Sequence, residues 1–369
     1  MGIQDLSKFL RDKGINCFVT NYPLNNLKGY RIGIDANNFL FVQGAGLHKD
    51  AVYKTVNVID DGLDREQLLQ KLYLRVLNSL IVFMNNGITP ILVFDGEAQI
   101  EKTAEREKRR EDRIKRVNKI KELQDEMDKI PIHLRNVKNL GNVPKELWEQ
   151  ALKYTELEKE IKKILSTQVS VHRDEIDAVK ILLENLGIPC IIAESEGEMM
   201  CAELSVANQT AATFSTDSDC LALGVNFYFD TISGAKKGKG GFINGTVLGP
   251  VLEELKLNMD EFRDFCILLG SDFNERIPGY GPAKGYKLIE ECRTIENIRD
   301  KKGLDITPLN YIRTRELLTP KSRDWSQYSL DIDFNKFNRN VEPVLNQYSL
   351  SSILPNLFEA VENVRSARC

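Results

Sequence analysis

The chain has 369 residues and a formal net charge of −4, and hydrophobic residues make up 42% of it. These values predict one large folded domain or two ordinary ones, and they argue against a surface coated throughout in phosphate-binding cations. The first residues lack the apolar core of a signal peptide, and no apolar run reaches the length of a membrane span. Seven scattered cysteines without zinc-site spacing indicate free thiols in a reducing compartment. We therefore expect an intracellular protein that is neither secreted nor membrane-bound.

Two apolar segments of the first hundred residues each end in an aspartate. Residues 31–34 are typical of a buried strand that ends at Asp35, and residues 89–94 of a second strand that ends at Asp95. Residues 66–85 between them have helical apolar spacing, so a right-handed crossover would bring both strand ends to one edge of a parallel sheet. Either aspartate alone could simply cap a helix. Two at one sheet edge favour a functional site.

Two acidic pairs follow further along the chain. Glu196 and Glu198 flank a glycine after an apolar strand, and Asp217 and Asp219 flank a serine after another. Carboxylate oxygens are the ligands that Mg²⁺ and Mn²⁺ prefer, and clustered carboxylates repel one another unless a cation neutralises them. The alternative is a pair of solvated turns. Together with the two earlier aspartates, the pairs favour a hard-cation site.

A charged insertion separates these two regions. Residues 102–121 contain ten Lys or Arg and four Asp or Glu and few apolar side chains, which predicts a helix outside the core. Such a helix could be merely solvated and laced with ion pairs, or it could hold phosphates over the carboxylates. Residues 43–64, before the helix at 66–85, are expected to form a loop.

A glycine-rich turn lies between two helices near residue 280. Residues 259–269 predict an apolar helix, the sequence PGYGP contains Gly279 and Gly281, and a second helix follows with Lys284 near its start. Backbone N–H groups of such a turn and the positive end of the second helix can bind a phosphate. An ordinary glycine turn is the alternative. Residues 328–340 are expected to be irregular.

Six motifs occur along the chain in this order: MGIQDL, IGIDANNF, ILVFDG, ESEGEMMCAEL, TDSDCLALG and LLGSDFNERIPGYGPAKGYKLI. Together they resemble the flap endonuclease/XPG-type family of structure-specific 5′ nucleases. The resemblance implies an α/β fold with a PIN-like, mostly parallel central sheet, a helical arch and a helix-hairpin-helix. It implies cleavage of DNA at 5′ flaps or junctions, with 5′–3′ exonuclease activity as a second reaction.

The resemblance also implies domain boundaries and site residues. The regions are a nuclease region at 1–100, the arch at 101–168, a second nuclease region at 169–258, the helix-hairpin-helix region at 259–310 and an extension at 311–369. Two Mg²⁺ ions, for which Mn²⁺ can substitute, would be held by seven carboxylates: Asp35, Asp95, Glu196 and Glu198 at the first ion, and Asp217, Asp219 and Asp272 at the second. Lys102 and Arg109, seven residues apart on one helical face, would polarise the scissile phosphate.

Further residues are implied to contact DNA. Gly2 would approach the junction, and Phe41 stands where the family has a stacking tyrosine. Arg75 lies one turn before Ser79, the position of a family arginine. The remaining implied contacts are Glu196, Gly270, Asp272, Gly279, Gly281 and Lys284, with a K⁺ ion on the hairpin carbonyls.

The remaining expectations concern partners and alternatives. The protein is expected to be a monomer at a site of DNA replication, nuclear or viral, and its last residues contain no recognisable sliding-clamp peptide. One alternative is a catalytically inactive protein that binds DNA junctions. Another is a glycosyltransferase that uses Asp217 and Asp219 to hold a sugar nucleotide. That second alternative leaves Asp35, Asp95 and Asp272 unexplained.

Overall fold

A computed structural model describes residues 2–55, 58–97, 103–135, 144–168, 171–235, 238 and 240–368. The chain divides into two compact units. Unit 1 comprises residues 1–40, 74–102 and 176–369, and unit 2 comprises residues 41–73 and 103–175. Among the helices of the described residues, none has the length and apolar character needed to cross a bilayer.

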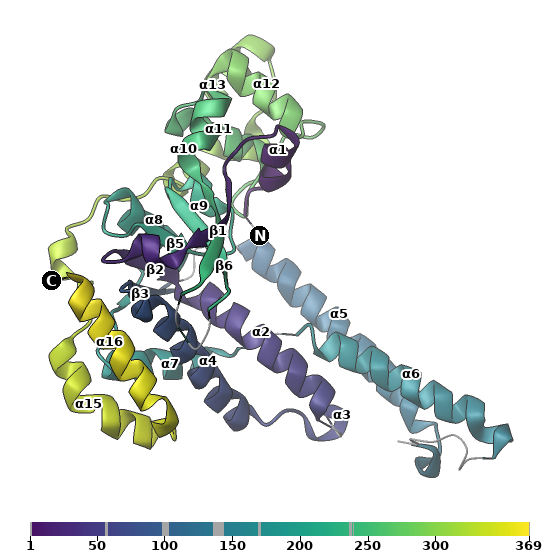
Figure 1. Ribbon diagram of the computed structural model, residues 1–369. Helices are drawn as coiled ribbons and strands as arrows, with labels where there is room; N and C mark the ends of the chain where they lie inside the picture. The colour runs from purple at the N-terminus through teal and green to yellow at the C-terminus, as the bar shows by residue number, and fades with distance from the viewer. Residues whose placement is uncertain are drawn as a thin grey trace. The chain divides into compact units, whose positions relative to one another are not determined.

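Unit 1 contains a seven-stranded sheet in the order β1-β7-β6-β5-β2-β3-β4 (Figure 1). Strands β6, β5, β2, β3 and β4 run parallel, and β7 and β1 add an antiparallel edge. The bounds are β1 (Phe18–Pro23), β2 (Arg31–Asp35), β3 (Thr89–Phe94), β4 (Cys190–Ile192), β5 (Ala212–Phe214), β6 (Phe227–Ser233) and β7 (Phe242–Val247). This mostly parallel sheet with flanking helices confirms the predicted fold class.

The helices of unit 1 surround the sheet and form a bundle beside it. They are α1 (Leu6–Asp12), α8 (Gly197–Val206), α9 (Asp219–Ala222), α10 (Leu248–Leu255), α11 (Met259–Leu269), α12 (Pro282–Cys292), α13 (Ile295–Lys302), α14 (Tyr311–Leu317), α15 (Phe334–Gln347) and α16 (Leu354–Arg368). Three helices continue from one unit into the other: α2 (Ala36–Lys54), α4 (Arg65–Asn85) and α7 (Arg173–Asn185).

Different helices cover the two faces of the sheet. Successive side chains of a strand point to opposite faces, so neighbouring residues contact different helices. On one face, Phe214 of β5 packs edge-on against Phe39 of α2, with ring centroids 5.2 Å apart. On the other face, α8 packs across β2 and β3. A Cβ at Gly33 of β2 would lie 3.5 Å from the sulfur of Cys201, an ordinary contact distance, so Cys201 of α8 lies directly over this strand position.

Residues 319–333, which we call the C-terminal strap, pack against α8. The Arg323 guanidinium binds the buried carboxylate of Glu203, and it also pairs with Glu194 at 2.7 Å. The backbone N–H of Lys321 donates to Glu203 at 3.2 Å. Leu330 joins an apolar cluster with side chains of β3 and α8. The strap therefore holds α8, the helix that begins within the first acidic pair and carries Glu198.

Unit 2 is helical. It contains α3 (Val58–Asp61), α5 (Thr103–Asp128) and α6 (Trp148–Leu165), and α5 and α6 lie side by side (Figure 1). Their shared core is small and apolar and is built from Leu123, Met127, Tyr154, Leu157 and Ile161, among others. The residues of α5 before that core, from 106 to 113, are exposed.

Two predictions of secondary structure from the sequence were wrong. Residues 43–54, expected as a loop, continue α2, because Gly44, His48 and Val52 form a buried stripe at helical spacing. A stripe that contains a glycine and a histidine has little hydrophobic signal. Residues 328–340 were expected to be irregular, but α15 begins within them, with Asp333 capping it through Lys336 N–H at 2.9 Å.

We predict that Arg323→Ala lowers the free energy of unfolding by about 3 kcal/mol, because it leaves the carboxylate of Glu203 buried without its cation. Urea unfolding followed by circular dichroism measures the change. Arg339→Ala, at an exposed position of α15, is the matched control and should change stability by no more than about 0.5 kcal/mol. Equal stability of the two variants would show that the strap does not brace α8.

Candidate active site

The carboxyl ends of four parallel strands bring the predicted acids to one edge of the sheet. β2 ends at Asp35, β3 is followed by Asp95, β4 leads to Glu196 and Glu198, and β5 leads to Asp217 and Asp219. β5, β2, β3 and β4 are neighbours in that order. Acids from four separate segments therefore meet where open α/β sheets place their sites.

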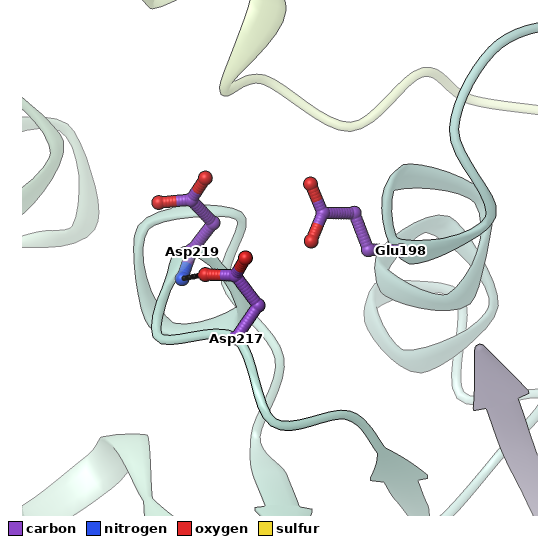
Figure 2. Close-up of side chains that lie close together, drawn as sticks. All are labelled: Glu198, Asp217 and Asp219. Atoms are coloured by element: carbon purple, nitrogen blue, oxygen red, sulfur yellow. Dashed lines mark hydrogen bonds between the residues drawn. The ribbon is translucent and has the colours of Figure 1, made fainter. Parts of the chain in front are cut away.

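Three of these carboxylates form a tight group. Oxygen atoms of Glu198, Asp217 and Asp219 all lie within 4.8 Å of one another. Figure 2 shows Glu198 projecting from α8 toward the two aspartates of the β5–α9 turn. All three side chains are buried, with exposed fractions of 7%, 7% and 0%. Asp219 donates its backbone N–H to the Asp217 Oδ1 at 3.1 Å, which fixes the turn.

Asp35 and its acidic neighbours crowd further carboxyl groups at this edge of the sheet. Burial raises the pKa of Asp35 to about 8, with further contributions from the charges of Asp95, Asp217 and Glu196. The Asn38 N–H donates to Asp35 at 3.1 Å and offsets part of that rise. Two ionised carboxylates about 4.8 Å apart repel each other by roughly 3 kcal/mol at an effective dielectric constant of about 20. A cation among these groups would remove that repulsion.

The glycine of the first acidic pair links it to Asp95. Gly197 donates its N–H to the Asp95 Oδ1 at 2.7 Å. A Cβ at Gly197 would lie 2.7 Å from the Val93 carbonyl oxygen, so only glycine allows this approach. Glu198 lies in the first turn of α8, where the helix dipole stabilises a negative charge.

The donor set suits hard divalent cations. The thiols of Cys201 and Cys220 are buried beside the carboxylates, and burial raises the pKa of each well above its usual value. Among the described residues, the close group of potential ligands consists of carboxylate oxygens and contains no cysteine or histidine. An all-oxygen set fits Mg²⁺, Mn²⁺ or Ca²⁺ better than Zn²⁺ or Cu²⁺.

The amino terminus packs against the acidic turn. Gly2 is buried with φ +91°, and a Cβ there would lie 1.9 Å from the Asp217 Oδ1 and 2.6 Å from the Ser218 Oγ. The Ser218 hydroxyl also donates to the Ile3 carbonyl at 3.5 Å. Gly2 therefore lies beside the carboxylates, and no larger residue fits without moving Asp217.

Asp272 lies in the turn after α11 and is half-buried. α11 packs against α9, the helix that begins at Asp219. Among the described residues, the group within 4.8 Å consists of the three carboxylates named above, so Asp272 is outside it. Gly270 has φ +87° and accepts the Gln4 N–H at 3.0 Å, which ties this turn to the amino terminus.

Three other predicted site residues are on helices. Arg75 is exposed on α4, Phe41 is 41% exposed on α2, and Arg109 is exposed on α5. Phe41 and Arg109 belong to unit 2, whereas the carboxylates belong to unit 1. Lys102 lies outside the described residues.

Two residues near the carboxylates had not been identified from the sequence. Asn37 and Asn38, in the first turn of α2, hydrogen-bond to Asp95 and to Thr216. In the sequence they belong to the motif IGIDANNF, directly after the strand-ending Asp35 at the start of a helix.

We predict that Gly2→Ala lowers the affinity of the protein for Mn²⁺ by about 10-fold or more, because the new methyl group displaces Asp217. Titration calorimetry measures the affinity. Gly14→Ala is the matched control, since Gly14 also has a positive φ, +72°, but open space around its Cβ position. If both variants bind Mn²⁺ like the unchanged protein, Asp217 is not a ligand.

Comparisons with known proteins agree with this arrangement. The XPG N-terminal domain family matches residues 1–116, and the XPG I-region family matches residues 187–272. Flap endonuclease 1 of Entamoeba histolytica is 32% identical over 338 residues, which cover 90% of this chain and 79% of that protein. Flap endonuclease 1-2 of Paramecium tetraurelia is 32% identical over 307 residues, covering 81% of this chain and 67% of that protein.

Solved structures share the fold. Flap endonuclease-1 from Methanococcus jannaschii superposes with a TM-score of 0.57 at 20% identity, covering 95% of this chain and 97% of that one. The catalytic core of Rad2 in complex with DNA substrate gives a TM-score of 0.55 at 16% identity, covering 99% of this chain and all of that one. The sequence matches and the shared fold, taken with the acidic edge of the sheet, establish that this chain belongs to the flap endonuclease/XPG family.

Proposed function

We propose that this protein hydrolyses phosphodiester bonds of DNA at junctions between single strands and duplex, as a structure-specific 5′-flap endonuclease with accompanying 5′–3′ exonuclease activity. The observation that carries the proposal is the group of three buried carboxylates at the carboxyl edge of the sheet. Relatives named flap endonuclease and a similar fold solved with a DNA substrate support it. Membership of this family argues against the glycosyltransferase alternative.

The donor set supports two divalent cations, Mg²⁺ with Mn²⁺ as a substitute. These cations would be bound by Glu198, Asp217 and Asp219, with Asp35 and the acids around it as further ligands. Asp272 would complete the second site. When bound, such cations lower the pKa of a water molecule and neutralise charge on the phosphate. The carboxylates of the chain would fix the positions of the cations and occupy the ligand positions that other donor atoms could take.

The basic helix α5 would bind the scissile phosphate and the 5′ strand. Arg109 is exposed among other cations of α5, and Lys102 precedes that helix in the sequence. Fixed cations stabilise the negative charge that develops during phosphoryl transfer. In this proposal α5 and α6 form the arch that selects single-stranded 5′ ends.

The α11–α12 hairpin would bind duplex DNA. Gly281 precedes the first turn of α12 with φ −87°, and a Cβ there would meet no heavy atom within 4 Å. Neither backbone strain nor crowding in the protein requires glycine at this position, so the open space suits the close approach of a phosphate. Lys284 donates to the Gly279 carbonyl at 3.1 Å and adds positive charge. A K⁺ ion would use the neighbouring carbonyls.

Other parts of the proposal rest on the family. Gly2 and Phe41 would contact bases near the junction, and Arg75 would contact the backbone of the DNA. The protein would act as a monomer at sites of DNA replication or repair.

We predict that Asp219→Asn reduces Mg²⁺-dependent cleavage of a labelled 5′-flap substrate by about 100-fold or more, because it removes a ligand charge without changing shape. Binding of the same DNA, measured by fluorescence anisotropy without Mg²⁺, should persist. Asp305→Asn, in an exposed loop, is the control and should cleave normally. Cleavage at the normal rate by the Asp219 variant would refute the proposed cation site. An unchanged protein that binds flaps but never cleaves them would be the inactive junction binder.

We predict that Gly281→Ala weakens binding of nicked duplex DNA about 5-fold, because its methyl group occupies the space left for a phosphate. The melting temperature should not fall, since the backbone conformation suits alanine. Gly249→Ala, whose Cβ position is equally open on α10, serves as the control for affinity. Unchanged affinity in the Gly281 variant would place the duplex elsewhere.

A further inference from the structure

Asn37 and Asn38 connect the ends of the two strands on either side of β2. The Asn37 Nδ2 donates to the Asp95 Oδ2 at 2.7 Å, and the Asp95 N–H approaches the Asn37 Oδ1 at 3.5 Å. The Asn38 Nδ2 donates to the Thr216 Oγ1 at 2.8 Å, and the Thr216 N–H donates to the Asn38 Oδ1 at 3.3 Å. Each amide therefore uses both its donor and its acceptor on one neighbouring segment.

The order of the strands in the sheet shows which segments these hydrogen bonds connect. β2 lies between β3 and β5, so Asn37 reaches the β3 side and Asn38 reaches the β5 side. The two sides carry different acids. Asp95 contacts the first acidic pair through Gly197, whereas Thr216 directly precedes Asp217. Two adjacent side chains thus span the distance between the two groups of carboxylates.

The bonds also fix how Asp95 is oriented. Its Oδ1 accepts from the Gly197 N–H and its Oδ2 accepts from Asn37, so neither oxygen can rotate away without losing a donor. A carboxylate in place of the amide of Asn37 would repel Asp95. On the other side, the Thr216 hydroxyl can donate as well as accept, so an acceptor in place of the Asn38 Nδ2 would still be satisfied.

We propose that Asn37 and Asn38 are positioning residues that set the spacing of the carboxylates on either side of β2, and thereby the affinity of the site for divalent cations. This inference rests on the proposed cation-dependent nuclease activity. Partners that orient metal ligands typically change metal affinity by about 10- to 100-fold when removed. The alternative is that the two amides stabilise the fold only.

Calorimetric titration of the DNA-free protein with Mn²⁺ tests the inference. Asn37→Ala and Asn38→Ala should each lower Mn²⁺ affinity by about 10-fold or more. Asn38→Asp should restore most of that affinity, whereas Asn37→Ser, too short to span the gap, should not. Asn340→Ala is the matched control and should bind Mn²⁺ normally. It also removes an amide hydrogen bond between distant parts of the sequence, the bond from Asn340 to the Asn185 carbonyl at 3.2 Å.

A second readout separates positioning from folding. In cleavage assays the two alanine variants should need about 10-fold more Mg²⁺ for half-maximal kcat, with the KM for DNA unchanged and activity largely recovered at high Mg²⁺. Mn²⁺ affinities equal to that of the unchanged protein would overturn the inference while leaving the proposed function intact. Failure of the unchanged protein to bind Mn²⁺ would overturn the proposed function itself. If the alanine variants unfold while Asn38→Asp binds Mn²⁺ normally, Asn37 and Asn38 have only a structural role.

Discussion

Mutual repulsion among carboxylates is the constraint on which the arrangement of unit 1 depends. Glu198, Asp217 and Asp219 are held within 4.8 Å of one another in a buried position, and the pKa of Asp35 is raised to about 8 by burial and by the neighbouring acids. A fold reaches such a state only if other interactions offset the cost. Backbone donors supply part of that offset, as when the Gly197 N–H binds Asp95 and the Asp219 N–H binds Asp217.

The remainder of unit 1 can be understood as support for these strand ends. Parallel pairing of β5, β2, β3 and β4 fixes the edge from which the acids project. The C-terminal strap holds α8 through Arg323 and Glu203, and α11 packs against α9. Residues from the first to the last quarter of the chain therefore contribute to the position of a few oxygen atoms. Precise spacing of this kind is what cation-assisted phosphoryl transfer requires.

The sequence was informative where the signal was local. Asp35 and Asp95 end apolar runs whose pairing in a parallel sheet follows from the intervening helix, and the structure brings them near each other as predicted. The charged run at residues 102–121, which has few apolar side chains, predicted a helix outside the core, and α5 (Thr103–Asp128) is a helix whose residues 106–113 are exposed. The resemblance to family motifs predicted further site residues that hydrophobic periodicity alone could not identify.

Features that depend on long-range packing could not be read from the sequence. Gly2 needs to be glycine because Asp217, far along the chain, occupies the space beside it. The amides of Asn37 and Asn38 bond to residues just beyond the ends of β3 and β5, and nothing in the local sequence identifies these partners. β1 pairs with β7 across more than two hundred residues, and although its sequence FVTNYP contains residues that favour strands, nothing local identifies its partner.

The central claim is that acids from separate segments form one cation site. Anomalous diffraction from crystals grown with Mn²⁺ tests it most directly, because the signal locates the ion independently of activity. The account predicts strong peaks in contact with Glu198, Asp217 and Asp219, with Asp35 beside them. Peaks elsewhere on the surface, or none at saturating Mn²⁺, would contradict it.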